Sequence, residues 1–390
     1  MSQEKKHILI ITYNDYPVYE GLGVRIKNLA RVIVEKGHTV TIFAPNIENR
    51  KPKSEAFAGG VIIRANIYVP AFLRKNRVIA RAWSMLVQTI VTPFVYWKHL
   101  RKIPVDLIMA EQVYAILPAL VIKTITRSKI YVDDIGTVSD ILAEIGMTRI
   151  SKLFTLFEKA LFRGCDDFVY TSPVSLGYYQ ARGGKPTIYL PNGVDCDAFY
   201  PVASSHAETV VFFNASTYSS QNTEAAVNFI DIGKKVMESK PKDIRFRLVC
   251  WPEYNLPEIV RNTIHTQPEW LSFEAGVEAI AQEIGEADIA ILAYSPGHHL
   301  TGGVRLKALE YMACGKLIIS TPEGVEGIIG LIPNEHYMLA GSVQEFPDII
   351  FSIRQSPAEI KRISKNARQF VLDHYDWRAT MTEFADRLLM

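Results

Sequence analysis

The sequence predicts an α/β protein made of two domains, each with a mainly parallel β-sheet. Short apolar runs alternate with helical segments along the whole chain, which is the pattern of α/β domains. The first strand, at 7–12, is followed by a helix and a strand at 39–44, and such a crossover joins parallel strands. The length of 390 residues favours two cores over one, and residues 196–208 are expected to form a linker between the halves.

The expected elements follow from the apolar runs and from the glycines and prolines that bound them. In the first half, strands are expected at 7–12, 39–44, 60–66, 106–110, 129–132, 167–171 and 187–190. In the second half they are expected at 209–214, 245–250, 270–273, 287–292, 316–320 and near 337–340. Expected helices include 112–125, 149–163, 173–182 and 223–238, and the tail 357–390 should be helical in two pieces broken at 374–377.

The stretch GGVRLKALE predicts a glycine turn followed by a helix with two cations in its first turn. Gly302 and Gly303 let backbone N–H groups approach an anion, while Arg305 and Lys307 supply full positive charges. Cations at the start of a helix oppose its dipole, at a cost of up to about 1 kcal/mol each. A bound anion would offset this cost, so the pattern favours a diphosphate at this position. Glu310 follows, and its carboxylate can accept hydrogen bonds from two ribose hydroxyls. The alternative is an ordinary amphipathic helix with a surface ion pair.

Other loops after expected strands supply further candidates, because ligands of open α/β sheets bind at the carboxyl ends of strands. The loop TPEGVEG contains Val325 and Glu326. A loop after the first strand contains Gly21 and Gly23, but it lacks the G-x-G-x-x-G pattern of nicotinamide dinucleotide sites, and a plain turn is the alternative. His299 precedes the cationic helix, and a solvated loop histidine is the alternative there.

The loop DDIGTVSD places Asp133, Asp134 and Asp140 after an expected strand, where they either face a ligand or serve in turns and helix capping. The run Asp195-Cys196-Asp197 resembles a carboxylate pair for a divalent metal. It lies in a turn with no third ligand nearby, so no metal site is expected.

Composition indicates a globular protein with reduced thiols. The four cysteines are far apart and form no C-x-x-C pair, and neither a signal peptide nor a membrane-spanning segment is expected. The net charge of +2 is unevenly spread, with 26 Lys and Arg against 16 Asp and Glu in residues 1–195. Such asymmetry is a sign of a charged partner.

Residues 71–102 are the best candidate for contact with such a partner. They contain seven Lys or Arg and no acidic residue, and the basic flanks enclose an apolar middle with two tryptophans. This composition favours a helix lying on an anionic membrane. The alternative is a helix packed on the sheet and kinked at Pro93. No nucleic-acid-binding motif accompanies the basic residues, so nucleic acid is not expected as a partner.

Several of these motifs together resemble the family-4 type of retaining glycosyltransferases with the GT-B fold, also called group 1 glycosyltransferases. The resemblance is carried by the GLG loop and its GHTV strand, by LPNGVD at 190–195, by GGVRLKALEYMACGKLIIST with the following EGVEGI, and by HYDW at 374–377. It covers essentially the whole chain, and its most specific part is 302–328.

The resemblance implies two Rossmann-like domains facing a cleft. It implies an acceptor domain at 1–195, a nucleotide-sugar donor domain at 196–375, and a C-terminal helix at 376–390 that crosses back to the first domain. Carried over by position, Glu310 binds the donor ribose, Arg305 and Lys307 bind the diphosphate, and Asp134 takes a catalytic position. The remaining donor-binding residues would be Gly21, Gly23, Gly302, Gly303, His299, Val325 and Glu326.

The sequence also departs from the family pattern at three places. Gly302 stands where the family usually has a glutamate that contacts the donor sugar. The stretch NASTYSSQN, at 214–222, lacks the usual arginine and lysine, so the phosphate charge must be met mainly by Arg305 and Lys307. DDIGT stands where a histidine is often found.

The predicted function is therefore transfer of a sugar from a nucleotide diphosphate sugar to a glycan or lipid-linked acceptor. We expect a hexosyltransferase that acts with retention and without a metal or other cofactor, in the synthesis of cell-surface polysaccharide or glycoconjugates. It would be cytoplasmic or peripheral on the inner membrane face. Two alternatives stay open: a nucleotide-sugar epimerase using an acid and base among Asp133, Asp134, Glu111 and the histidines, or a non-catalytic subunit that binds nucleotide sugar.

Overall fold

The chain forms two compact units, each built around its own sheet. The computed structural model describes residues 5–13, 22–47, 51–57, 59–73, 77–133, 139, 147–202, 206–217, 219–276, 279–297 and 303–389. Unit 1 comprises the chain up to Pro191, the short segment 301–303 and the C-terminal residues from Thr380. Unit 2 comprises the rest, from Asn192 to Ala379.

Within the described residues, unit 1 contains an eight-stranded sheet with the order β3-β4-β2-β1-β5-β6-β7-β8. All of its strand pairs are parallel except β3 with β4, which are antiparallel. The strands are β1 His7–Ile11, β2 Thr39–Ile47, β3 Ser54–Phe57, β4 Gly60–Ile67, β5 Leu107–Glu111, β6 Lys129–Asp133, β7 Asp167–Tyr170 and β8 Ile188–Tyr189. The central strands β1 and β5 are buried over their whole length, as strands covered on both faces must be.

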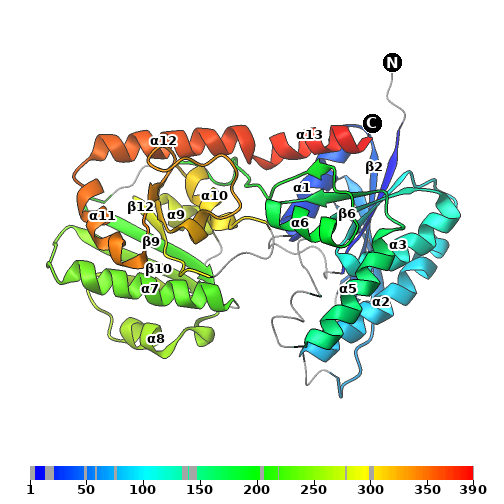
Figure 1. Cartoon of the computed structure of the whole chain (residues 1–390), viewed down its shortest axis with the longest axis horizontal. Helices are drawn as coiled ribbons and strands as arrows, with labels where there is room; N and C mark the ends of the chain where they lie inside the picture. The colour runs from blue at the N-terminus through cyan, green and yellow to red at the C-terminus, as the bar shows by residue number, and fades with distance from the viewer. Residues whose placement is uncertain are drawn as a thin grey trace. The chain divides into compact units, whose positions relative to one another are not determined.

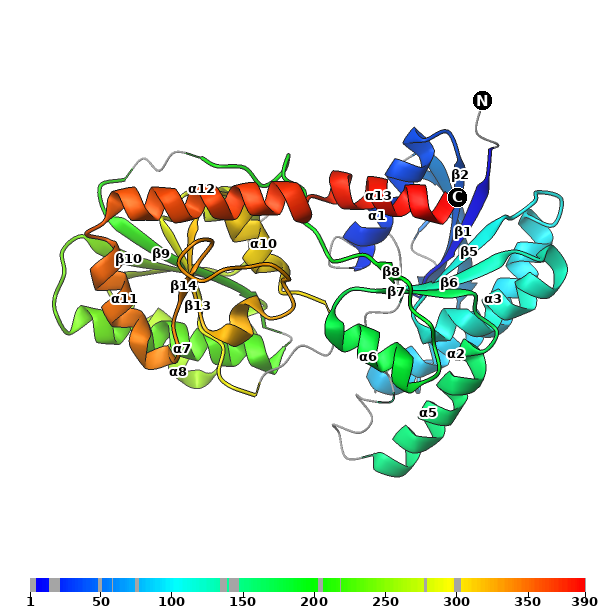
Figure 2. The same cartoon turned by 45° about the horizontal axis from the view of Figure 1, so that its top comes forward.

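Helices cover both faces of this sheet (Figure 1). They are α1 Leu22–Glu35, α2 Arg77–His99, α3 Val113–Thr126, α5 Thr148–Phe162, α6 Pro173–Ala181 and, from Thr380 on, α13 Trp377–Leu389. Helices α2, α3 and α5 lie together on one side, and α1 lies on the other (Figures 1 and 2). Helix α13 adds buried Phe384 and Leu388 to unit 1, and an ion pair of 2.6 Å joins its Asp386 to Lys36.

Unit 2 contains a parallel sheet in the order β11-β10-β9-β12-β13-β14, again counted within the described residues. Its strands are β9 Thr209–Ser216, β10 Ile244–Trp251, β11 Leu271–Glu274, β12 Ile289–Leu292, β13 Leu317–Ser320 and β14 Met338–Leu339. Its helices are α7 Ser220–Met237, α8 Glu258–His265, α9 Ile280–Gly285, α10 Leu306–Ala313, α11 Phe346–Ile353 and α12 Pro357–His374, with short 3₁₀ turns η1 Glu253–Asn255, η2 Pro322–Val325 and η3 Val343–Glu345. Helices α7 and α8 lie on one side of the sheet, and α10 and α12 on the other (Figures 1 and 2).

The predicted fold class is confirmed, because both units are α/β with parallel sheets. The break at 374–377 in the C-terminal helices is also as predicted. Strand β3 was missed, because it is a four-residue edge strand with mostly exposed side chains and carries no apolar run. Pro93 lies inside helix α2, which continues from Arg77 to His99. No helix in the described part of the chain is both long and apolar enough to cross a membrane.

Candidate functional site

The candidate site in unit 2 lies at the point where the strand order of the sheet reverses. From β9 the chain proceeds outward through β10 and β11, whereas β12, β13 and β14 are added on the other side of β9. Loops leaving the carboxyl ends of β9 and β12 therefore diverge at this point, and open α/β sheets bind their ligands there. The segment between β12 and β13 contains α10, which carries most of the predicted residues.

Arg305 lies immediately before α10, so the predicted position inside the first helical turn is wrong by one residue. Its backbone is extended, with φ −73° and ψ 104°, and the helix begins at Leu306. The side chain is buried, and its guanidinium carbon lies 3.6 Å from the ring centroid of Tyr294. Its Nε donates to the Glu323 carbonyl at 2.9 Å and its Nη1 to Gln221 Oε1 at 3.2 Å.

Burial lowers the pKa of Arg305, and the nearby groups Tyr294, Glu326 and Glu323 act in the opposite direction. An arginine nonetheless stays charged in proteins, because its pKa starts above 12. The site therefore holds a desolvated guanidinium beside an aromatic face, which is a strong partner for an anion.

Lys307 lies in the first turn of α10 and shares one neighbour, Tyr294, with Arg305. Its Nζ donates to Asn222 Oδ1 at 3.1 Å and lies 4.8 Å from the ring centroid of Phe213 and 5.6 Å from that of Tyr294. The Tyr294 hydroxyl also donates to Asn222 Oδ1, at 2.8 Å. One amide oxygen from the start of α7 thus fixes both the cation and the tyrosine.

Glu310 lies one turn further along α10 and is half-buried. Burial raises the pKa of Glu310 to about 7, against the opposing charge of Lys307. No side chain or backbone amide among the described residues donates a hydrogen bond to its carboxylate. The next residue, Tyr311, is fully buried and donates to Asn214 Oδ1 at 2.6 Å, which ties α10 to strand β9.

The loop after β13 approaches the same place through η2. The Glu323 carbonyl accepts from Arg305, while Val325 is buried and Glu326 is half-buried. Gly324 has no room for a side chain, because a Cβ there would lie 2.2 Å from Ser320 Oγ and 2.8 Å from the Leu292 carbonyl oxygen. This glycine therefore lets the loop lie close to the ends of two strands.

The structure describes seven of the eleven predicted site residues. Gly303 has φ +80°, a conformation that favours glycine, and Gly23 is buried in α1. The predictions for Gly21, Asp134, His299 and Gly302 concern positions outside the described residues. In contrast, Gln221, Asn222 and Tyr294 were not predicted, although they contact Arg305 or Lys307.

In unit 1, strands β5 and β6 each end on a buried carboxylate, that of Glu111 and that of Asp133. Asp133 accepts two hydrogen bonds from buried Arg25, from Nε at 2.7 Å and from Nη2 at 3.1 Å. The same guanidinium donates to the carbonyls of Leu190 and Pro191. Asp133, a candidate acid or base of the epimerase alternative, is therefore part of a buried ion pair that joins α1, β6 and the turn after β8.

A metal centre is the other chemistry that such a site can hold. Over the ranges that the structure describes, no three His, Cys, Asp or Glu side chains gather as a ligand set. All four cysteines are unpaired thiols, and burial raises the pKa of each to about 12, so they remain protonated at neutral pH. What the described site offers a ligand is two cations and one carboxylate on a single short segment.

Two family models match the chain and together cover most of it. Residues 19–198 match the model described as Glycosyltransferase Family 4, and residues 237–386 match the one described as Glycosyl transferase-like. No curated protein matches the chain at the level of sequence.

Several solved structures resemble the whole chain. Sucrose-phosphate synthase from Thermosynechococcus elongatus is 16% identical, with a TM-score of 0.74 and 98% of each chain covered. The HepE protein of Anabaena, solved with UDP and glucose, is 15% identical, with a TM-score of 0.66 and 98% and 99% covered. An E. coli trehalose-6-phosphate protein bound to UDP-2-fluoroglucose is 11% identical, with a TM-score of 0.69 and 99% of each chain covered. At such identities the likeness shows a shared fold.

Proposed function

The chain belongs to the glycosyltransferases with the GT-B fold, and we propose that it moves a sugar from a nucleotide diphosphate sugar onto a glycan or lipid-linked acceptor. Retention of the anomeric configuration, independence from metal and a role in cell-surface polysaccharide or glycoconjugate synthesis in the cytoplasm belong to the same proposal. The observation that carries it is the grouping of Arg305, Lys307 and Glu310 at the switch point of the unit 2 sheet.

The two cations suit the charge that develops during sugar transfer. Breaking the bond between the sugar and the phosphate leaves negative charge on the departing diphosphate. Arg305 and Lys307 are held in place by Gln221, Asn222 and Tyr294 before any reaction, so they need little rearrangement to stabilise that charge. In this proposal they supply the electrostatic stabilisation that a divalent metal provides in other transferases.

Glu310 suits the ribose of the donor. Its carboxylate accepts no hydrogen bond from the described residues, so it can accept one from each of two vicinal hydroxyls. Two of the similar solved structures were determined with UDP or a UDP-sugar. This supports UDP-glucose as the first donor to test.

The test is a calorimetric binding screen of UDP-, GDP-, ADP- and TDP-sugars with the wild-type chain and with Arg305→Ala/Lys307→Ala. We expect one nucleotide to bind the wild type, and the double variant to lose at least about 3 kcal/mol of binding free energy, or more than 100-fold in affinity, because two charge-assisted contacts are removed. The matched control is Lys234→Ala/Lys242→Ala, which removes two exposed cations of unit 2 outside the site. Binding by none of the nucleotides, or equal losses in both variants, would overturn the donor assignment.

The alternatives predict different products from the same samples. An epimerase converts the donor to a free epimer without acceptor, whereas a binding subunit holds the donor and turns nothing over. A transferase instead gives a glycoside only when acceptor is present, and the anomeric proton coupling of that product in NMR reports retention or inversion.

The proposal also includes contact with an anionic membrane through residues 71–102. Helix α2 exposes Leu86, Ile90, Phe94 and Trp97, which recur at intervals of three or four residues and share one face, and Phe94 is 70% exposed. Lys98, Arg101 and Lys102 follow directly at its basic end. An exposed apolar stripe beside basic residues is the pattern of helices that lie in the membrane interface.

Helix α5 extends this surface. It exposes Leu153 and Leu156, at 67% and 65%, and α3 packs against both α5 and α2. The test is sedimentation with phosphatidylglycerol vesicles. We expect Ile90→Glu/Phe94→Glu to release the protein from the vesicles, whereas Tyr254→Glu/Ile259→Glu, two exposed apolar residues of unit 2, should leave binding unchanged. Equal partitioning of both variants would contradict membrane contact through α2.

A further inference from the structure

A cationic cavity lies in unit 2, at the end of the strands opposite the one that carries Arg305 and Lys307. It has a volume of about 610 Å³, within the range of small-molecule sites. It borders the start of β9 at Thr209 and the residues that precede β12. Arg305 and Lys307 follow the carboxyl end of β12, at the other end of these strands. We call it the α12 pocket, because one face of helix α12 forms its outer wall. Its basic lining consists of His206, Lys316, Arg354, Lys361, Lys365 and Arg368.

The positive charge of the α12 pocket exceeds its negative charge. Only two carboxylates line it among the described residues, Glu208 and Asp288, against five Lys and Arg. Glu208 is already paired with Arg245 at 3.0 Å, and Asp288 accepts from the Val210 amide at 2.9 Å. Among the cations, Arg354 is paired with Asp243 at 2.7 Å, and His206 lies 3.9 Å from Asp288. The other four Lys and Arg still outnumber the two carboxylates, so the pocket keeps a net positive charge.

Three of the cations share one face of α12. Lys361, Lys365 and Arg368 are spaced by four and three residues, which places them on the same side of a helix. Arg368 is fixed, since its Nη1 donates to the carbonyls of Ala313 and Phe199. Lys361 and Lys365 are exposed, and no described residue pairs with them. Their ammonium groups are available to a ligand.

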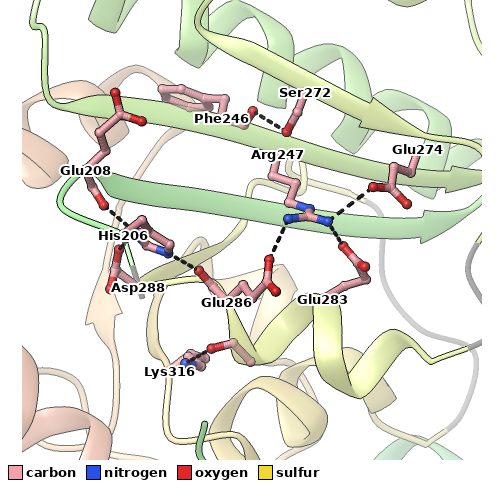
Figure 3. Close-up of polar contacts among 11 residues, drawn as sticks. His206, Glu208, Phe246, Arg247, Ser272, Glu274, Glu283, Glu286, Asp288 and Lys316 are labelled. Carbon is pink, nitrogen blue, oxygen red and sulfur yellow. Dashed lines mark hydrogen bonds and ion pairs between the residues drawn. The ribbon is translucent and has the colours of Figure 1, made fainter. Parts of the chain in front are cut away.

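One buried cation, Lys316, lines the same space. Lys316 is only 6% exposed, and its Nζ donates to the Gly285 carbonyl at 2.6 Å (Figure 3). An ammonium has three donors, and the Val202 carbonyl at 3.5 Å is its only other acceptor among the described residues. Ser364 also lines the pocket from α12, but its hydroxyl oxygen is covered by other atoms and is not offered to a ligand. A buried ammonium with unused donors is costly, and a bound anion would satisfy them.

His206 adds to the positive character. Its Nδ1 lies 2.7 Å from the Glu208 carbonyl oxygen and its Nε2 lies 2.6 Å from the Glu286 carbonyl oxygen (Figure 3). Carbonyl oxygens only accept, so both contacts are hydrogen bonds when the ring is doubly protonated. The geometry thus favours an imidazolium at this wall of the pocket.

We propose that the α12 pocket binds a phosphorylated small molecule at a site separate from the donor diphosphate. Phosphate oxygens accept hydrogen bonds from several ammonium and guanidinium donors at once, and the described walls supply both kinds. The volume is larger than a single phosphate needs, so the ligand carries a further group of about the size of a sugar. The site goes beyond the proposed sugar transfer and does not depend on it.

The test uses inorganic pyrophosphate as the probe, measured by calorimetry on the full chain. Arg305→Ala/Lys307→Ala is the background, so that the donor cations contribute nothing. We expect this background to bind one pyrophosphate, and the addition of Lys361→Ala/Lys365→Ala to weaken that binding at least about tenfold, because two charged donors are lost. Both lysines are exposed, so the fold should be retained, and the thermal midpoint checks it.

The control adds Lys234→Ala/Lys242→Ala to the same background and removes the same charge from unit 2 outside the pocket. This control should change the affinity less than twofold, because its lysines do not line the cavity. Absence of pyrophosphate binding in the background variant would overturn the proposal. Equal weakening by the two lysine pairs would overturn it as well, because the probe would then respond to general surface charge. A specific loss with Lys361→Ala/Lys365→Ala supports it, and sugar phosphates are then compared on the same samples.

Discussion

The raised pKa of Glu310 should make donor binding depend on pH around neutrality. Burial raises this pKa to about 7. Only the ionised carboxylate accepts hydrogen bonds from both ribose hydroxyls, because the protonated form has given one oxygen a hydrogen. Donor affinity should therefore rise with pH as Glu310 loses its proton.

The size of the effect follows from the ionised fraction. With a pKa of about 7, the carboxylate is ionised in roughly one eleventh of the molecules at pH 6 and in roughly ten elevenths at pH 8. If donor binds only the ionised form, its Kd should fall about tenfold from pH 6 to pH 8, or about 1.4 kcal/mol. About three quarters of this logarithmic change should lie between pH 6 and pH 7, because half of the molecules are already ionised at pH 7.

The assay is calorimetric titration with an intact nucleotide sugar at pH values from 6 to 8 and constant ionic strength. An intact nucleotide sugar is preferred to the free diphosphate, whose terminal phosphate titrates near pH 6. Glu310→Gln keeps the size of the side chain but cannot ionise, so it should bind more weakly and show no slope. A flat profile for the wild type, or the same slope in Glu310→Gln, would refute the ribose role of Glu310.

Three further predictions concern groups that hold these sites in place. Tyr294→Phe should bind donor within about threefold of the wild type, whereas Tyr294→Leu should lose about 0.5–2 kcal/mol in calorimetry, because it removes the aromatic face beneath Arg305. Arg25→Met should lower the free energy of unfolding in urea by about 3–5 kcal/mol by leaving Asp133 buried and unpaired, and Arg25→Met/Asp133→Leu should recover most of it; no recovery would contradict the ion-pair reading. Burial lowers the pKa of His206, but the carbonyls and carboxylates around it outweigh burial and raise it. The stability that this imidazolium adds should be complete below about pH 6.5 and lost as pH rises through the raised pKa. The difference in unfolding free energy between wild type and His206→Gln should then shrink from pH 6 to 8, and a constant difference would argue against a charged ring.

The sequence was informative where the signal is local. Arg305, Lys307 and Glu310 lie within six residues of one another, and glycines mark the turn before them. Their grouping at the start of a helix could therefore be predicted from the sequence. The exact start of that helix could not be predicted, because Arg305 has an extended backbone that its contacts with Tyr294 and Glu323 stabilise. Tertiary contacts of this kind outweigh local helix propensity.

The partners of these cations were missed for a different reason. Gln221 and Asn222 lie 84 and 85 residues away from the groups they contact, on a different crossover of the sheet. In the sequence, the stretch 214–222 that contains them differs from the family pattern only by its lack of basic residues. The loops that leave the carboxyl ends of neighbouring parallel strands lie at the same edge of the sheet, and this rule would have placed them beside α10 once the strand order was known. The order of strands in a sheet has no local signature in the sequence. The pairing of Arg25 with Asp133 could not be predicted for the same reason, because it joins α1 to β6.

The contacts of Arg305 and Lys307 with Gln221 and Asn222 have a consequence for how a donor would enter. Both amide oxygens are neutral acceptors, and such hydrogen bonds are weaker than those to a charged oxygen. A carboxylate at either position would compete with the incoming diphosphate on equal terms and leave an ion pair to be broken. Amides keep the two cations oriented and yet give way to a phosphate at little cost. Neutral amides at both positions therefore suit a site in which the two cations exchange one acceptor for another as donor is taken up and product diphosphate is released.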